Sequence, residues 1–396
     1  MANRIMLNET SYHGTGAIKE IATEAKTRAF KKAFVCSDPD LIKFGVTKKV
    51  TDVLDEAGLA YEIYSDIKAN PTIQNVQNGV AAFKKAEADY IVAIGGGSSM
   101  DTAKAIGIII ANPEFEDVRS LEGVAPTKKP CVPIIAVPTT AGTAAEVTIN
   151  YVITDVEKKR KFVCVDPHDM PVIAVVDPDM MSSMPKGLTA STGMDALTHA
   201  IEAYVSTLNG PFTDPLALQA IEMVLDYLPG SYKCDMVARE QMHYAQCLAG
   251  MAFSNALLGI VHSMAHKTGA AFSTGHIPHG CANAIYLPYV IKYNAKDAVA
   301  AKRYAEIARR MGLAGTSEQA LINSLVEKID EFNVKLNIPK TLKDFGINED
   351  EFKEKVDKIA ELAVGDACTG SNPRAIDPAA MAKLLTCTYY GTEVDF

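Results

Sequence analysis

Five short apolar runs in the first half of the chain restrict its possible folds more than any other feature. They are Ala33–Cys36, Tyr61–Tyr64, Tyr90–Ile94, Pro133–Val137 and Val172–Val176. The runs do not alternate with polar residues and each ends in a turn sequence, as expected for strands buried on both faces of a parallel sheet. Helical segments such as residues 72–86 and 99–112 lie between them. Residues 1–184 are therefore predicted to form an α/β domain.

The second half of the sequence has a different pattern. From about Lys186 onward, runs typical of strands nearly vanish and apolar residues recur with helical periodicity. The predicted helices are residues 189–205, 214–229, 237–256, 259–272, 281–294, 298–312, 317–335, 348–363 and 377–391. We therefore predict an all-helical domain over residues 185–396, with its boundary within Asp179–Gly187.

Metal-binding side-chain types are concentrated in this helical half. Residues 259–283 contain half of the eight histidines, namely His262, His266, His276 and His279. The pairs Asp195/His199 and His262/His266 are each spaced i,i+4 among apolar neighbours, so each pair projects from one helix face. Buried carboxylate and imidazole groups are costly unless they are paired or bound to a metal.

This donor set favours a metal site over ordinary core histidines. A carboxylate combined with imidazoles suits iron or zinc better than calcium or magnesium. The alternative for any single histidine is a hydrogen-bonded core position, and we assign His13, His168 and His243 to that class. Two spaced pairs and the Pro278-His279-Gly280 turn make the alternative weak for the cluster.

Two loops in the first half resemble anion-binding turns. Gly95-Gly96-Gly97-Ser98-Ser99 follows a predicted strand and precedes a helix, an arrangement that presents backbone N–H groups to phosphate. The segment 139–143 is a second strand-end loop, rich in hydroxyl groups. Together they indicate one ligand crevice, although a glycine cluster alone also fits a tight turn. Asp38 follows an earlier strand, where it would accept from ribose hydroxyls and repel a 2′-phosphate, favouring NAD over NADP.

Composition excludes several classes of protein. The formal net charge of -9 argues against nucleic acid or an anionic membrane as a partner. The eight cysteines contain no CxxC pair and indicate reduced thiols in a cytosolic protein. No apolar stretch reaches the ~18 residues of a membrane span, and the N-terminus lacks the apolar region of a signal peptide. We therefore expect a cytoplasmic protein.

Five ordered motifs resemble one known family, the iron-activated (group III) alcohol dehydrogenases. They are GGGSSMDTAK, PTTAGTAAEVT, the helix carrying Asp195, His199 and Glu202, the His262–His266 segment HSMAH, and PHGCAN. The resemblance covers the chain from end to end. Within the family, TTAGTAAEVTINYVITD and the segment Cys368–Arg374 are most similar to the lactaldehyde reductases, also called propanediol oxidoreductases.

The resemblance implies an architecture and a set of site residues. The fold would be dehydroquinate synthase-like, with an α/β NAD-binding domain, a helical metal-binding domain, and a cleft between them. The implied metal ligands are Asp195, His199, His262 and His279. His266 would lie near the metal and nicotinamide as a catalytic proton relay rather than a ligand. The implied NAD contacts are Asp38, Asn70, Gly96, Gly97, Ser98, Thr139, Thr140, Thr143 and Lys161.

The implied activity is NAD-dependent oxidation of a small alcohol or diol, or the reverse reduction, with Fe²⁺ or alternatively zinc. Lactaldehyde and 1,2-propanediol are the expected pair, and family members are commonly homodimers. A general short-chain alcohol or 1,3-propanediol dehydrogenase is the alternative within the fold. A non-enzymatic metal-binding protein is the alternative from another class.

One departure from the family pattern leaves a ligand open. The chain is slightly longer than the family between His266 and the PHG turn, through Phe272–Gly275. His276 consequently lies three residues before His279, and register alone does not choose between them. We assign His279 because it occupies the PHG turn.

Overall fold

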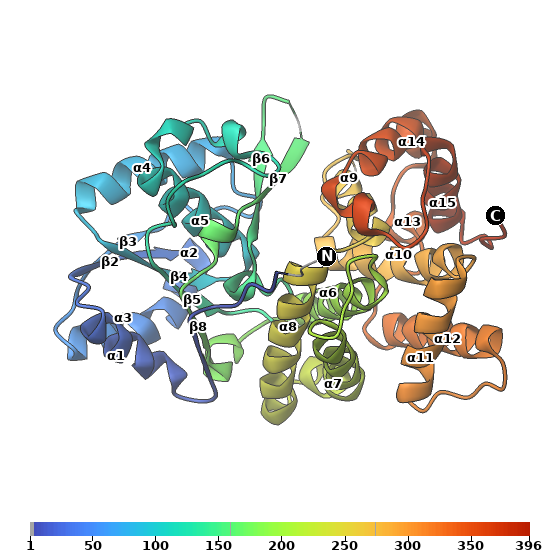
Figure 1. Cartoon of the computed structure of the whole chain (residues 1–396), viewed down its shortest axis with the longest axis horizontal. Coiled ribbons are helices and arrows are strands. Elements are labelled where there is room, and N and C mark those ends of the chain that lie inside the picture. The colour runs from blue at the N-terminus through green and yellow to red at the C-terminus, as the bar shows by residue number, and fades with distance from the viewer. Residues whose placement is uncertain (1–3, 159, 274) are drawn as a thin grey trace. The chain divides into compact units, whose positions relative to one another are not determined.

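The structure is a computed structural model that describes residues 4–158, 160–273 and 275–396 (Figure 1). The chain forms two compact units. Unit 1 comprises the chain up to Met184 together with Arg239–Ser254, and unit 2 comprises Pro185–Ala238 and Asn255–Phe396. Each unit is described separately below.

Unit 1 is built on a six-stranded parallel sheet with the order β1-β8-β5-β4-β2-β3. Its strands are β1 (Thr10–His13), β2 (Lys32–Ser37), β3 (Ala60–Tyr64), β4 (Tyr90–Gly95), β5 (Ile134–Pro138) and β8 (Ile173–Val176). The central strands β4, β5 and β8 are buried at every position, which explains why their sequences are apolar without alternation. All five predicted strands are confirmed, but β3 at the edge of the sheet is largely exposed rather than buried on both faces, and β1 was not predicted.

Helices cover both faces of this sheet (Figure 1). On one face, α1 (Glu20–Thr27) and α3 (Val46–Glu56) share a core with alternate residues of β2 and β4. On the other face, α4 (Ile73–Ala86) and α5 (Gly97–Ala111) pack against the intervening residues. A short hairpin of β6 (Asn150–Asp155) and β7 (Arg160–Val165) lies outside the sheet and was not predicted from the sequence.

The order of the strands creates a switch point between β2 and β4. The chain leaves β2 toward β3 at one edge, whereas it leaves β4 toward β5 in the opposite direction. Ligands of open α/β sheets bind beyond the carboxyl ends of the strands at such a point. The ends of β2, β4 and β5 are therefore where a ligand of unit 1 is expected.

Unit 2 is helical, as the sequence predicts. Its helices are α6 (Lys186–Val205), α7 (Asp214–Tyr232), α9 (Ile260–Thr268), α10 (His279–Asn294), α11 (Ala298–Arg310), α12 (Glu318–Lys335), α13 (Leu342–Phe345), α14 (Glu349–Val364) and α15 (Pro378–Tyr390). Helix α6 packs against α7 and α10, and α9 packs against α10 and α14. The contacts of α6 and α9 with α10 position the site described next.

Two helices, α8 and α9, differ from what the sequence periodicity predicts. Helix α8 (Met236–Ala256) contributes Arg239–Ser254 to unit 1, where a Cβ atom on Gly250 would lie 2.3 Å from the Cβ of Ala144. Helix α9 ends at Thr268, earlier than the predicted residue 272. In the described part of the chain, no single helix has the length and apolar character of a membrane span, and only the pair α8–α9, bent by 102°, passes by length and composition.

Candidate metal centre and nucleotide loops

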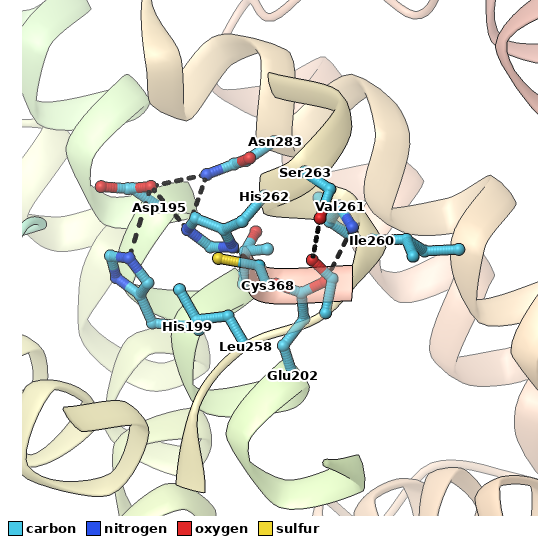
Figure 2. A network of polar contacts seen from close by, with 12 residues as sticks. Asp195, His199, Glu202, Leu258, Ile260, Val261, His262, Ser263, Asn283 and Cys368 are labelled. Atoms are coloured by element: carbon cyan, nitrogen blue, oxygen red, sulfur yellow. Dashed lines mark hydrogen bonds and ion pairs between the residues drawn. The ribbon is translucent and has the colours of Figure 1, made fainter. Parts of the chain in front are cut away.

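One carboxylate and three imidazoles converge in unit 2. Helix α6 supplies Asp195 and His199, α9 supplies His262, and α10 begins at His279. The Oδ1 atom of Asp195 lies 3.7 Å from Nε2 of His262, 3.7 Å from Nε2 of His279 and 4.0 Å from Nε2 of His199. Figure 2 shows Asp195, His199 and His262 pointing toward one another. The first three side chains are buried, while that of His279 is 34% exposed.

These separations fit a single metal ion. Donors that each lie about 2.1 Å from one ion are separated from each other by roughly 3–4 Å. The donor atoms of Asp195, His262 and His279 all lie within 4.8 Å of one another, and the His199 ring stacks on His262 at 4.5 Å. Within the described residues, this group of donors contains His279 and not His276, which is exposed.

A close approach of two helices brings His279 to this position. A Cβ atom on Gly280 would lie 2.0 Å from the carbonyl oxygen of Ser191 on α6. Only glycine therefore allows the first turn of α10 to rest on α6 with its present spacing. The proline at position 278 caps the helix in an extended conformation, so the helix begins at His279 itself.

Glu202 orients His262. Its Oε2 atom lies 2.5 Å from Nδ1 of His262, and its Oε1 atom accepts a hydrogen bond from the backbone N–H of Val261 at 2.8 Å (Figure 2). A carboxylate on Nδ1 fixes the tautomer and leaves the Nε2 lone pair facing Asp195, as second-shell carboxylates do in metal sites. A Cβ atom on Gly259 would lie 2.8 Å from Oε1 of Glu202, so this position needs glycine.

Asn283 completes the polar network around Asp195. Its Nδ2 atom donates to Oδ1 of Asp195 at 2.7 Å and lies 3.2 Å from Nε2 of His262 and 3.3 Å from Nε2 of His279. It follows His279 by four residues on α10, so the helix directs both side chains to the same site. The amide thus holds the Asp195 carboxylate in place.

The electrostatics of the site also favour a cation. Burial by itself raises the pKa of Asp195, but His199, His262 and His279 outweigh it and hold the pKa below its usual range. Burial lowers the pKa of His262, but Glu202 and Asp195 outweigh it and raise the pKa to about 9. Two buried carboxylates therefore attract positive charge to this position, which a divalent ion held by Nε2 of His262 would supply.

His266 lies beside this group rather than in it. It is one turn after His262 on α9, and its ring stacks on that of His279 at 5.3 Å with an interplanar angle of 9°. Its Nδ1 atom lies 3.2 Å from Oδ2 of Asp366. Among the described residues, the potential donor atoms grouped with that of His266 are those of Asp366 and Cys368.

The two predicted loops of unit 1 are in contact. Gly96 caps α5 at the end of β4, and a Cβ atom there would lie 3.2 Å from the Thr140 side chain. A Cβ atom on Gly97 would lie 3.2 Å from the Thr143 side chain. The first backbone N–H groups of α5, including that of Ser98, are therefore bordered by the hydroxyl groups of the second loop, a setting suited to phosphate.

The other candidate nucleotide residues lie at neighbouring positions of unit 1. Asp38 follows β2 and caps α2 (Pro39–Lys43), and its Oδ1 atom accepts from two backbone N–H groups. Asn70 accepts from Nζ of Lys161 on β7 at 2.6 Å. Thr139 is buried directly after β5, where its N–H donates to the carbonyl of Gly95. Asp38 and Thr139 thus lie with the glycine loop at the ends of β2, β5 and β4, whereas Asn70 and Lys161 contact each other.

Sequence reasoning assigned no role to Glu202 and Asn283 of the metal centre, nor to Asp366 beside it. Glu202 lies three residues after His199 on the same helix face, and Asn283 lies four residues after His279, so helical spacing is a signal for both. Asp366 is separated from His266 by 100 residues, and no local pattern links them.

Comparisons with known proteins match both halves of the chain to one family. The family model described as iron-containing alcohol dehydrogenase matches residues 8–178, and the C-terminal model of the Fe-containing alcohol dehydrogenase family matches residues 189–389. An NADPH-dependent butanol dehydrogenase of Clostridium saccharobutylicum is 51% identical, covering 99% of this chain and 100% of its own. The lactaldehyde reductase of Escherichia coli (strain K12) is 52% identical, covering 94% of this chain and 96% of its own.

Solved structures show the same fold. A 1,3-propanediol oxidoreductase superposes with a TM-score of 0.92 at 36% identity, covering 98% of this chain and 100% of its own. A sulfoacetaldehyde reductase from Bifidobacterium kashiwanohense in complex with NAD+ superposes with a TM-score of 0.86 at 27% identity, covering 99% and 100%. The chain therefore belongs to the iron-containing alcohol dehydrogenase family.

Proposed function

We propose that this protein is a metal-dependent NAD(H) oxidoreductase that interconverts a small alcohol or diol and its aldehyde, with lactaldehyde and 1,2-propanediol as the preferred pair. The observation that carries the proposal is the convergence of one carboxylate and three imidazoles around Asp195 in a family of iron-containing alcohol dehydrogenases. The similarity to the lactaldehyde reductase of Escherichia coli supports the choice of substrate.

Asp195, His199, His262 and His279 would hold the ion, which we assign as Fe²⁺ with zinc as the alternative. When bound, such an ion polarises a substrate oxygen and lowers the pKa of an alcohol. Glu202 keeps Nε2 of His262 directed at the ion, and Asn283 holds the Asp195 carboxylate. His266 is the proposed catalytic residue, because an imidazole beside the ligands can take up and return the substrate proton.

The nucleotide would be held by unit 1. The N-terminus of α5, with Gly96, Gly97 and Ser98, would bind the pyrophosphate, and the hydroxyls of Thr139, Thr140 and Thr143 would border it. Asp38 would accept from the adenosine ribose, and Asn70 with Lys161 would complete the contacts. When bound, NAD(H) accepts or supplies the hydride. The NAD+ complex of the sulfoacetaldehyde reductase supports this assignment.

We expect NADH to outperform NADPH by at least about tenfold in kcat/KM, because a 2′-phosphate beside the Asp38 carboxylate loses ~1.4 kcal/mol or more. Asp38→Gly should narrow this ratio. Asp38→Asn should also narrow this ratio. Because asparagine can still cap α2, this variant removes the charge of residue 38 without removing the helix cap. The measurement is kcat/KM with each cofactor for all variants.

Asp40→Asn is the matched control for this prediction, because Asp40 is an exposed acidic residue on the same short helix. It should leave the ratio unchanged. Equal use of both cofactors by the unmodified protein would show that Asp38 does not contact the ribose. The Clostridium relative is NADPH-dependent, so sequence similarity alone does not decide the outcome.

A substrate panel tests the function itself. Protein reconstituted with Fe²⁺ should show its highest kcat/KM with lactaldehyde and 1,2-propanediol, ahead of 1,3-propanediol, ethanol and 1-butanol. A preference for butanol would overturn the substrate assignment but not the enzyme class, and it would match the name of the Clostridium relative. No turnover combined with no saturable NADH binding would leave a non-enzymatic metal-binding protein.

The proposal includes a homodimer located in the cytoplasm. Family resemblance supports the dimer, and the eight cysteines, all of which are free thiols in the structure, fit a reducing compartment. Light scattering of the purified protein gives its mass in solution and so tests the dimer directly.

A further inference from the structure

The carboxylate of Asp366 is fixed from several sides. Asp366 directly precedes a short 3-10 helix, η7 (Ala367–Ser371), and its Oδ1 atom accepts from the backbone N–H of Cys368 at 3.0 Å. Its Oδ2 atom lies 2.7 Å from Nζ of Lys267 and 3.2 Å from Nδ1 of His266. The side chain of Asp366 is only 2% exposed. A buried carboxylate with this set of donors has one defined orientation.

The same contacts determine the protonation of the groups that meet there. The ammonium of Lys267 at 2.7 Å and the backbone N–H of Cys368 at 3.0 Å favour the ionised form of this buried carboxylate. An ionised carboxylate can only accept hydrogen bonds. The imidazole nitrogen that faces it, Nδ1 of His266, must therefore carry the proton, which leaves Nε2 as the acceptor.

The position of the His266 ring makes this tautomer relevant. Its ring lies parallel to that of His279 at 5.3 Å and edge-on to that of His262 at 6.1 Å. The ring that carries Nε2 is thereby held next to two of the candidate ligands.

A second metal site is the competing explanation for this cluster. Donor atoms of His266, Asp366 and Cys368 lie within 4.8 Å of one another. However, the ammonium of Lys267 already occupies the carboxylate at 2.7 Å. Burial raises the pKa of the Cys368 thiol well above its ordinary value, and the charges of Asp366 and Glu202 raise it further. The resident ammonium already balances the charge of this carboxylate, which disfavours a metal ion at the cluster.

We propose that Asp366 is a positioning residue that holds His266 with the proton on Nδ1, so that Nε2 exchanges the substrate proton. In alcohol oxidation the O–H bond breaks, the proton forms a new bond with Nε2, and the hydride leaves the carbon for NAD+. The resulting imidazolium keeps its Nδ1–H on Asp366, whose negative charge balances it. Reduction reverses these steps. This inference rests on the proposed role of His266.

Asp366→Asn tests the inference with little change of shape. Its amide oxygen can still accept from the N–H of Cys368, but its NH₂ group takes the place of Oδ2, the nearer acceptor of Nδ1, and the negative charge that would balance an imidazolium is lost. We expect kcat to fall by about 10²- to 10⁴-fold, because wrong-tautomer and general-base losses lie in this range. The KM for NADH, bound metal per chain and melting temperature should stay near those of the unmodified protein.

Two further variants separate positioning from a structural role. His266→Asn combined with Asp366→Asn should be no less active than His266→Asn alone, because Asp366 acts through His266. Lys267→Met is the matched control, since it removes the other partner of the carboxylate but leaves His266 facing an ionised group. It should cost less than about tenfold in kcat.

The outcomes are distinguishable. Full activity of His266→Asn would remove the proposed role of His266 and the inference with it. Loss of activity in His266→Asn with full activity of Asp366→Asn would overturn the inference alone, as would losses that multiply in the double variant. Histidine ¹⁵N NMR of the zinc-loaded unmodified protein gives a test without any variant: protonated Nδ1 on His266 supports the inference, and protonated Nε2 alone overturns it.

Discussion

Asp195→Ala should release the bound metal and lower kcat/KM by at least about 10³-fold, since Lewis-acid stabilisation is worth several kcal/mol and ~4 kcal/mol corresponds to that factor. Asp195 contributes the one oxygen that faces three imidazole nitrogens, so no other described donor lies in its place. His262→Ala should likewise lose the metal and show a similar fall in kcat/KM. Metal per chain by mass spectrometry and kcat/KM by NADH absorbance are the measurements.

The fold should survive both changes, because α6 and α9 are held mainly by buried apolar residues. Asp226→Ala is a suitable control, because Asp226 is exposed on the neighbouring helix α7 and its loss should change neither quantity. Full metal content and activity in either the Asp195 or the His262 variant would refute the ligand assignment.

His279→Ala should weaken metal affinity by about 10- to 100-fold or more, since even second-shell losses reach this scale. The reason is its Nε2 atom, which lies 3.7 Å from Oδ1 of Asp195 at the first residue of α10. His276→Ala should leave metal affinity unchanged and alter mainly the KM of substrate or cofactor, because His276 is exposed in the loop before α10. Competitive titration with a chelator measures both affinities.

These two histidines form a matched pair, because they lie three residues apart and carry the same side chain. Pro278 between them disfavours a helical conformation at the preceding residue, so they do not share a helix face. A large loss of affinity in the His276 variant with none in the His279 variant would assign the ligand to His276.

Much of the fold follows from patterns that are local in sequence. Runs such as Tyr90–Ile94 are apolar on both faces because β4 is central in the sheet, and that burial is visible in the residues themselves. The missed strand β1 has half-exposed residues and is an edge strand of the described sheet, so its sequence carries no such signal of burial on both faces. The hairpin β6–β7 was also missed. It lies outside the sheet, and its two strands are held by pairing with each other, which the sequence of one strand does not show.

The candidate site likewise contains residues that local spacing reveals and contacts that it does not. Spacing of i,i+4 on one helix found Asp195 with His199 and would also find Asn283 from His279. The contact between Glu202 and His262 spans 60 residues, and the contact between Asp366 and His266 spans 100. Such pairs depend on how α6, α9 and η7 pack, and helical periodicity does not encode that packing.

Anomalous diffraction at the iron edge, from crystals of protein loaded anaerobically with Fe²⁺, tests the metal centre most directly. One peak per chain is expected, bonded to Oδ1 of Asp195 and to Nε2 of His199, His262 and His279. A peak beside Asp366 and Cys368, or no peak at all, would contradict the assignment of the metal to Asp195 and the three histidines.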